Sequence, residues 1–552
     1  MRPLVLILIA ALALQAQAPR LLEVQERRLA NGARLLVVER RGLGAFHAAL
    51  VFRGGQAEEP AALAGATDLL ARALYGETWP EDLEPSRTQA LEPLLAQEEG
   101  LLESLRAEHL RLRHDPTSRG QLPELEASLA STQARLAALC STAPLAGLYA
   151  SRGGREGAEP TADALVAWTE LPQEAFEVWC RTEAARLRTL QLSRFSAARA
   201  ALVATLRATP AQALALLRGA ALPGHPYGRA LVDNLPALEA MRRSDLRKYA
   251  RRALGPGRLT IILVGGLSLE QAAPLVEKHF GTLPVPPDGE EALLPEIPAD
   301  LGDRRLQASL GGDSRLLTGW RIPPRSHPDH LPLRMAAQLL GGGSTGRLAS
   351  RLAAGKAVAR ETALGMDLPG SHLPGLLVVD LKPADGHSLA ELESALHGEI
   401  LRLQQEPIGA EEWSRALAQL ELGDLRTLDE PAALAQALGR AWAEGGDWRL
   451  LDLEMQRLRT LTPEAVQAAA RAWLKPSHRT TARLEPSTAD ELNPLEAQTA
   501  KVLNALAATR IQDPAQREQL VAEGLRQLRM LSPDERLRTL KLLEAQLAPE
   551  KR

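Results

Sequence analysis

The sequence predicts an α+β protein built from two similar lobes. Strand-like and helix-like segments are intermixed in both halves, a proline-rich segment divides them, and the order of segments before this divider recurs after it. A chain of 552 residues also exceeds the roughly 250 to 300 residues at which a single core usually stops growing. We expect a first lobe at 19–282, a linker at 283–300, a second lobe at 301–486 and a helical tail at 487–552.

The first lobe opens on a predicted hairpin. Residues 24–29 and 34–38 flank Asn31-Gly32, a dipeptide that suits a type I′ turn, and a third strand is expected at 45–52. At 61–74 the spacing of apolar residues becomes that of a helix, with leucine and alanine side chains on one broad apolar face.

Residues 87–140 read as a helical hairpin inserted into this lobe. Two leucine-rich arms that also carry many Glu and Arg residues lie on either side of the breaker stretch 114–120. The rest of the lobe is expected as a strand at 164–169, helices at 173–190 and 196–207, and a strand at 259–264.

The second lobe is expected to repeat this order. The linker holds five prolines and an acidic patch, which is typical of an extended, semi-rigid spacer. Beyond it we expect a strand at 315–320, a helix at 331–340, a strand at 376–381 and long helices to Trp473.

Composition excludes several classes of protein. Hydrophobic residues make up 45% of the chain and charged residues 24%, a balance typical of globular proteins rather than of disordered or membrane ones. The net charge is -3, and the Lys and Arg residues are spread along the chain without forming a basic face, so nucleic acid is not expected as a partner.

The N-terminus predicts export. Arg2, an apolar run at 4–14 and the small-x-small site at 16–18 indicate a cleavable signal peptide at 1–18, and therefore a periplasmic or secreted protein. The run is shorter than the roughly 20 residues that span a bilayer, so no membrane span is expected after cleavage. Cys140 and Cys180 could pair in such a compartment or remain free, and the sequence leaves both open.

Five short motifs occur in a fixed order: Leu-Ala-Asn-Gly-Ala-Arg-Leu at 29–35, Gly-Gly-Gln-Ala-Glu-Glu-Pro at 54–60, His-Pro-Tyr-Gly at 225–228, Val-Gly-Gly at 264–266 and the glycine-rich segment at 339–348. Their order resembles that of the insulinase (pitrilysin) family of zinc peptidases. The resemblance covers most of residues 23–485. It implies two lobes that each consist of a mostly antiparallel sheet backed by helices.

The residues that carry zinc chemistry in the family are not retained. Its H-x-x-E-H motif supplies two zinc-binding histidines and a glutamate base, and a second glutamate follows on a later helix. The matching positions hold Asp68, Ala71, Arg72 and Thr205. A permanently charged guanidinium repels a dication, and alanine cannot activate water, so we expect no catalytic residue, no metal ligand and no cofactor. An ion pair between Asp68 and Arg72 at i, i+4 is expected instead.

Substrate contacts are the second feature that the resemblance carries over. It implies that Gly342 and Gly343 let a peptide approach the backbone and that Arg347 contacts the peptide's carbonyl groups; the alternative for Arg347 is an ordinary solvated helix residue. His327 and His330 flank Pro328, and a polar loop is expected there rather than a metal site.

These observations predict a non-catalytic insulinase-family homologue. The favoured role is a subunit that helps to bind unfolded peptide substrates beside an active insulinase-family subunit carrying the intact zinc motif. Two alternatives stay open: an active zinc metalloendopeptidase with unrecognised ligands, and a standalone periplasmic peptide-binding or scaffold protein.

Overall fold

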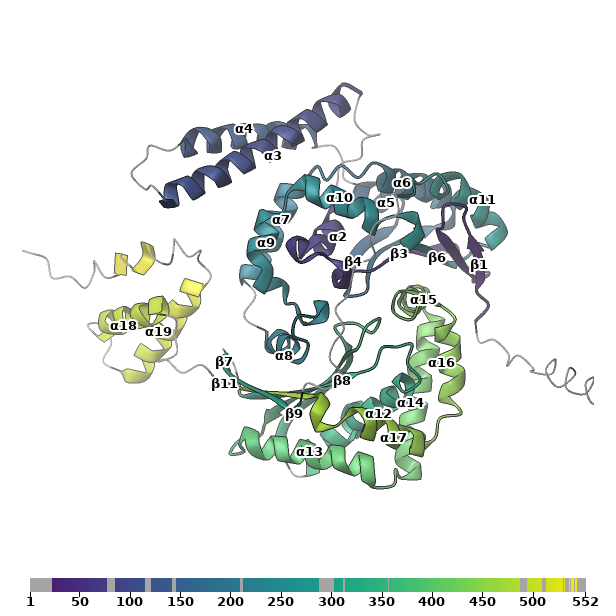
Figure 1. Ribbon diagram of the computed structural model, residues 1–552, viewed down its shortest axis with the longest axis vertical. Coiled ribbons are helices and arrows are strands. Elements are labelled where there is room, and N and C mark those ends of the chain that lie inside the picture. The colour runs from purple at the N-terminus through teal and green to yellow at the C-terminus, as the bar shows by residue number, and fades with distance from the viewer. Residues whose placement is uncertain are drawn as a thin grey trace, which may run out of the picture.

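The computed structural model describes residues 22–543 with gaps at 77–84, 115–120, 141–144, 209–211, 287–301, 311–312, 356, 487–493 and 509–512, and with scattered residues only beyond 529. The predicted signal peptide at 1–18 and most of the predicted linker lie outside the described residues. Two sheets, each backed by helices, form two lobes that face one another (Figure 1).

The first lobe contains a six-stranded sheet in the order β1-β2-β6-β3-β5-β4. Its strands are β1 (Gln25–Arg28), β2 (Arg34–Glu39), β3 (Ala45–Arg53), β4 (Arg155–Pro160), β5 (Ala164–Pro172) and β6 (Leu259–Gly265). All neighbouring pairs run antiparallel except β2 and β6. The predicted hairpin around Asn31-Gly32 is the β1–β2 pair, with Arg28 opposite Arg34.

The second lobe contains a five-stranded sheet in the order β7-β11-β8-β10-β9. Its strands are β7 (Arg304–Leu310), β8 (Arg315–Ile322), β9 (Ala359–Leu368), β10 (Gly375–Pro383) and β11 (Arg479–Pro486). This order repeats that of β2-β6-β3-β5-β4, including one parallel pair, β7 with β11, at the same place. The predicted α+β fold with two similar, mostly antiparallel lobes is therefore confirmed.

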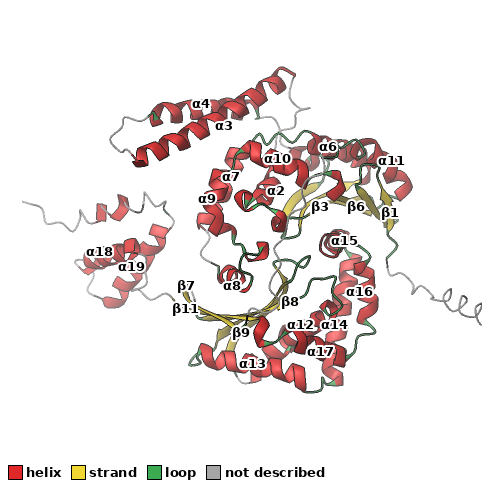
Figure 2. Ribbon diagram, in the orientation of Figure 1, coloured by secondary structure: helices red, strands yellow, loops and turns green. Residues whose placement is uncertain are grey.

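Helices cover one face of each sheet (Figure 2). In the first lobe these are α2 (Ala66–Gly76), α5 (Leu145–Ala150), α6 (Phe176–Arg188), α7 (Phe195–Ala208), α9 (Leu235–Ala240), α10 (Arg243–Ala253) and α11 (Leu269–Phe280). In the second they are α12 (His330–Gly341), α13 (Leu389–Gln405), α14 (Ala410–Asp429), α16 (Leu450–Leu458) and α17 (Pro463–Trp473). The predicted inserted hairpin consists of α3 (Pro85–His114) and α4 (Leu122–Leu139), and the tail carries α18 (Pro494–Ala508) and α19 (Pro514–Arg529).

The second face of each sheet is covered by a helix from the other lobe. Helix α15 (Pro431–Gly445) of the second lobe packs its buried leucines and alanines on β3 and β6 of the first. Helix α8 (Ala213–Ala221) of the first lobe packs on β8 and β11 of the second. Because each sheet buries its second face only through this exchange, neither lobe has a complete core by itself.

A buried carboxylate joins the lobes beside these helices. Asp163, 4% exposed, accepts hydrogen bonds from the backbone N–H groups of Ser371 and His372 in the second lobe and from the hydroxyl of Tyr227. The Tyr227 oxygen in turn accepts from the N–H of Leu373 at 3.2 Å. The His-Pro-Tyr-Gly segment therefore acts as part of an interlobe contact, in which a buried charge is satisfied by amide and hydroxyl donors.

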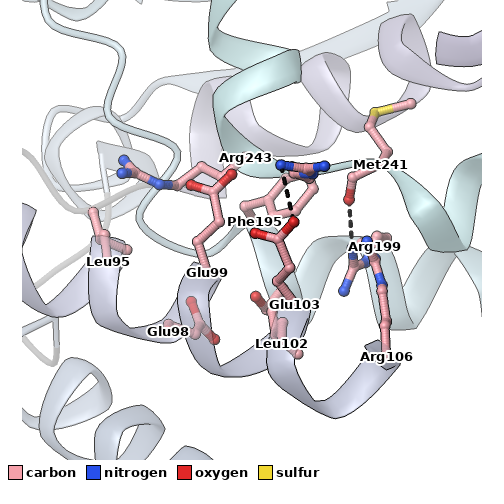
Figure 3. A pocket seen from close by; sticks show the side chains of 12 residues that line it. Leu95, Glu98, Glu99, Leu102, Glu103, Arg106, Phe195, Arg199, Met241 and Arg243 are labelled. Carbon is pink, nitrogen blue, oxygen red and sulfur yellow. Dashed lines mark hydrogen bonds and ion pairs between the residues drawn. The ribbon is translucent and has the colours of Figure 1, made fainter. Parts of the chain in front are cut away.

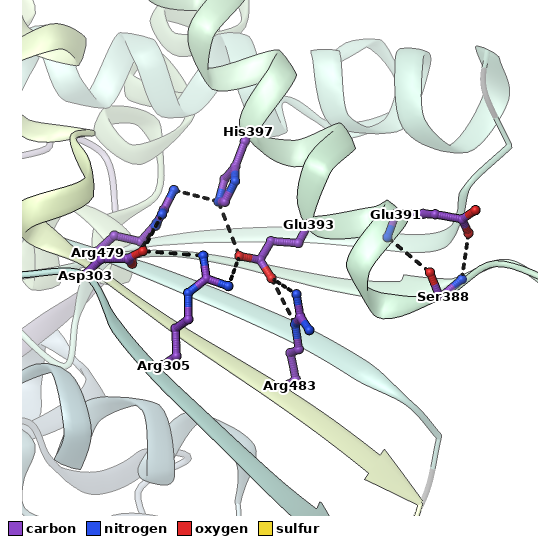
Figure 4. Close-up of polar contacts among 8 residues, drawn as sticks. All are labelled: Asp303, Arg305, Ser388, Glu391, Glu393, His397, Arg479 and Arg483. Carbon is purple, nitrogen blue, oxygen red and sulfur yellow. Dashed lines mark hydrogen bonds and ion pairs between the residues drawn. The ribbon is translucent and has the colours of Figure 1, made fainter.

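A charged network ties the neighbouring strands β7 and β11 to helix α13 (Figure 4). Arg483 on β11 donates to Glu393 at 2.7 Å, and Arg305 on β7 lies 3.1 Å from the same carboxylate. Arg479 pairs with Asp303 at 2.7 Å, next to the first residues described after the linker. The parallel β7–β11 pair is therefore held by side chains as well as by its ladder.

The structure also bears on the two cysteines and on helices that could span a membrane. Cys140 and Cys180 are both buried, and they form no disulfide with each other. None of the described helices is by itself long and apolar enough to cross a membrane; α7 and α8 meet that criterion only as a pair bent by 96°.

Glu59 defines where helix α2 begins. The predicted helix at 61–74 is a 3-10 turn followed by α2, because the Glu59 carboxylate accepts from the N–H groups of Gly65 (2.8 Å) and Thr67 (2.6 Å) at the helix N-terminus. The side chain is 7% exposed, and burial raises the pKa of Glu59 to about 7, although these hydrogen bonds oppose the shift.

The close packing of the exchanged helix α15 predicts that glycine-to-alanine substitutions on α15 and on the neighbouring α14 change stability in opposite directions. A Cβ at Gly439 on α15 would lie 2.8 Å from the buried Val51, whereas one at Gly423 on α14 would meet nothing within 4 Å. We expect Gly423→Ala to stabilise the protein by up to about 1 kcal/mol and Gly439→Ala to destabilise it by about 1–3 kcal/mol, measured by urea denaturation. Equal stabilisation by both would contradict the close packing of α15 on the first lobe.

Glu59 predicts a pH dependence of stability. A pKa of about 7 in the folded state, against 4.5 ordinarily, means that the stabilising contribution is complete below about pH 4.5 and is lost as the pH rises toward 7. The free energy of unfolding, measured relative to the non-titrating Glu59→Gln variant, should fall by about 3 kcal/mol between pH 4.5 and 7.5. A difference between the two proteins that does not change with pH would show that the carboxyl titrates normally.

Candidate functional site

The four positions that the sequence resemblance matches to the family's zinc motif lie on two adjacent helices, α2 and α7. Leu69, Leu70 and Leu74 are buried and fix α2 on the sheet, so the helix presents its remaining positions in a defined direction. Ala71 is 8% exposed and forms part of the same core, whereas Arg72 is exposed.

Asp68 is held by a residue that lies before the helix. Its Oδ2 accepts from Nε2 of Gln56 at 2.9 Å, and the expected ion pair with Arg72 is not formed. Gln56 reaches Asp68 because the turn at 54–57 is tied by backbone hydrogen bonds to residues 161–163, where a Cβ on Gly55 would lie 2.4 Å from the nitrogen of Ala164. Burial raises the pKa of Asp68 above its ordinary value, against the effect of the Gln56 hydrogen bond.

The fourth position offers no ligand. Thr205 is exposed on α7, and its hydroxyl donates to the carbonyl of Ala201 at 2.9 Å. Zinc requires at least three good protein donors. The four positions together supply one carboxylate, which already accepts a hydrogen bond from Gln56, together with one hydroxyl, one methyl group and one guanidinium. The residues therefore do not fit a zinc ion, and elsewhere in the described part of the chain no three His, Cys, Asp or Glu side chains are grouped to hold a metal.

The inserted hairpin docks beside this region (Figure 3). Arg243 on α10 pairs with Glu92 at 3.0 Å, Arg242 lies 3.3 Å from Glu103, and Arg106 donates to the carbonyl of Ala240 at 2.8 Å. These contacts are charged or polar, and they place α3 against the end of α9 and the start of α10. The hairpin is thus attached by ion pairs to the lobe that carries α2.

The glycine-rich segment lies at the end of α12. Gly342 approaches its own helix, since a Cβ there would lie 2.5 Å from the carbonyl oxygen of Gln338, and Gly343 adopts a φ of 62° next to open space. A π-helical turn, Leu348–Gly355, follows; such turns often occur near functional sites. The segment occupies the same place in its lobe, between α12 and β9, that the inserted hairpin occupies between α2 and β4.

Arg347 is neither solvated nor free. It is 3% exposed, and its Nε and Nη2 donate to the two carboxylate oxygens of Glu412 on α14 at 2.6 and 2.9 Å. Its Nη1 is buried without a hydrogen-bond partner among the described residues. The solvated alternative is therefore wrong, and a contact with peptide carbonyls stays a prediction that would involve Nη1.

His327 and His330 do not share a site. His327 precedes α12 and is half-exposed, whereas the buried His330 begins the helix and lies 2.8 Å from Asp367 across the lobe. The expected loop therefore ends one residue before His330.

The feature that sequence reasoning missed is the edge strand β4. It is the outermost strand of its sheet, it contacts α2, and one of its backbone edges has no partner strand among the described residues. Its sequence, Arg-Glu-Gly-Ala-Glu-Pro, carries no alternating apolar pattern, so only the preceding Gly153-Gly154 turn signalled it.

Comparison with known proteins gives one family and several structural relatives. Residues 240–420, from the end of α9 to the middle of α14, match the family described as the peptidase M16 inactive domain. An uncharacterised zinc protease of Mycobacterium leprae is 25% identical over 269 residues, which cover 47% of this chain and 59% of that one. The beta subunit of the mitochondrial-processing peptidase of Lentinula edodes is 24% identical over 256 residues, or 42% and 51%.

Solved structures share the fold over most of the chain. A protease from Helicobacter pylori superposes with a TM-score of 0.67 at 15% identity and covers 84% of this chain and 100% of its own. The first half of the periplasmic protease PqqL of Escherichia coli gives 0.61 at 14% identity, with 92% and 98% covered. The chain spans between half and three fifths of the length of the curated relatives that it matches.

The duplicated sheet order and these matches agree with one another. Residues 240–420 match the peptidase M16 inactive-domain family, and the chain resembles peptidase M16 proteins in fold over most of its length.

Proposed function

We propose that this protein is a non-catalytic insulinase-family subunit that binds unfolded peptides beside an active zinc peptidase. The observation that carries the proposal is the state of α2 and α7: the helices keep their packing, while Asp68, Ala71, Arg72 and Thr205 present neither a zinc ligand set nor a general base.

Peptide binding is supported by the free edge of β4. An extended peptide can add to such an edge through main-chain hydrogen bonds, with alternate side chains directed to the two faces of the sheet. Because β4 contacts α2, a peptide bound there would run past the former zinc positions. The strand is short and carries charged residues at both ends, which are features that keep an edge from pairing indiscriminately.

The partner and the location rest on the relatives. A subunit of mitochondrial-processing peptidase and the periplasmic protease PqqL are among the proteins that this chain resembles. With the predicted signal peptide at 1–18, these likenesses support a periplasmic subunit that works with an active family member. A standalone peptide-binding protein is the second candidate, and the free β4 edge supports it equally; copurification with an active homologue distinguishes the two.

The placement of the zinc motif predicts a gain of metal binding. The unaltered mature chain should hold far less than one zinc per chain after dialysis and should not cleave a quenched unstructured peptide. The variant Asp68→His, Ala71→Glu, Arg72→His, Thr205→Glu restores the ligand set and should bind zinc near stoichiometrically, measured by elemental analysis.

Two outcomes count against this placement. Stoichiometric zinc with chelator-sensitive cleavage in the unaltered chain would mean that it is an enzyme with other ligands. A folded fourfold variant that binds no more zinc than the unaltered chain would mean that the four positions are not those of the family's motif.

A further inference from the structure

A cavity of about 430 Å³ lies at the edge of the first sheet, on the face opposite α2. Strands β3, β4, β5 and β6 form its floor, and the first turn of the exchanged helix α15 forms its wall. The residues that determine its chemistry are His47, Arg155, Glu159, Trp168, Glu170 and Glu430.

His47 and Trp168 make an aromatic floor. Their rings are stacked, with centroids 6.0 Å apart and an interplanar angle of 16°. The indole extends across Gly157 on the edge strand, where a Cβ would lie 2.6 Å from the ring, so glycine is required for the indole to reach the sheet edge. The pairing register places Gly157 and Glu159 on the same face as Trp168.

His47 is an unsatisfied group within this cavity. It is 5% exposed, and its Nε2 has no hydrogen-bond partner among the described residues. Burial lowers the pKa of His47, so the imidazole is neutral near pH 7 and one ring nitrogen can accept a hydrogen bond. A buried polar atom without a partner costs about 1–3 kcal/mol, which a ligand that donates to it would recover.

The charges around the floor are acidic in excess. Arg155 pairs with Glu170 at 2.7 Å, whereas the exposed Glu159 and Glu430 have no ion-pair partner in the described part of the chain. An apolar aromatic surface with two free carboxylates at its rim and a buried acceptor favours an alkyl stem that ends in a cation.

We propose that this cavity binds the side chain of a lysine or arginine residue in a peptide that lies along β4. The stem would pack on Trp168, the ammonium or guanidinium group would donate to His47, and Glu159 and Glu430 would balance its charge. This inference rests on the proposed peptide-binding function and adds a preference for basic residues to it. Because α15 closes the cavity, the site depends on the exchange of helices between lobes.

The test compares two fluorescent, unstructured peptides of about 12 residues that differ at one central position, lysine or N-acetyl-lysine. Acetylation keeps the stem and removes the charge. By fluorescence anisotropy, the mature protein should bind the lysine peptide about tenfold more tightly. The double variant Glu159→Gln, Glu430→Gln, which alters only exposed side chains, should reduce this preference to about two- to threefold, and Trp168→Leu should reduce it similarly.

The matched control is Glu270→Gln on α11, which removes one exposed carboxylate outside β4 and outside the cavity and should leave the preference unchanged. Equal affinity for the two peptides, or a preference that the double variant leaves intact, would overturn the basic-residue site while peptide binding stands. Failure of both peptides to bind would overturn the proposed peptide-binding function and the site with it.

Discussion

The exchange of helices α8 and α15 is the constraint on which the rest of the molecule depends. Each sheet is covered on one face by helices of its own lobe and on the other by a helix of the opposite lobe, so that the two cores form together. Asp163 adds a buried charge whose donors come from both lobes. This arrangement sets the position of the β4 edge relative to α15, and the cavity above His47 exists only because the first turn of α15 closes it.

The contacts that hold helix α2 are largely separate from the side chains that the resemblance matches to the zinc motif. Helix α2 is held by buried leucines, by the Glu59 carboxylate at its N-terminus and by the hydrogen bond between Gln56 and Asp68. Of the four positions matched to the zinc motif, only Asp68 takes part in these contacts. The edge strand to which the proposed peptide would add belongs to the sheet and not to these helix positions.

Local signals predicted the fold class, the Asn31-Gly32 hairpin, the inserted helical hairpin and the repeat of the fold, since each depends on turn residues or periodicity near in sequence. Edge strands β4, β7 and β9 were missed because their side chains are only partly buried and show no apolar run. The predicted ion pair between Asp68 and Arg72 was wrong. The 54–57 turn brings Gln56 close to Asp68, and the Gln56 side chain donates a hydrogen bond to its carboxylate instead. Glu412, which binds Arg347 from 65 residues away, and the wall of α15 over His47 are tertiary contacts that spacing could not reveal.

The central claim is that a peptide adds to the first sheet at β4 in a chain without zinc chemistry. Hydrogen exchange of the backbone amides, with and without a saturating unstructured peptide, tests it most directly. The account predicts that slowed exchange on binding concentrates in residues 155–160, with no change at the opposite edge strand β1, and that it persists in the presence of a chelator. Unchanged exchange at 155–160 while the peptide is bound would place the peptide elsewhere and contradict the account.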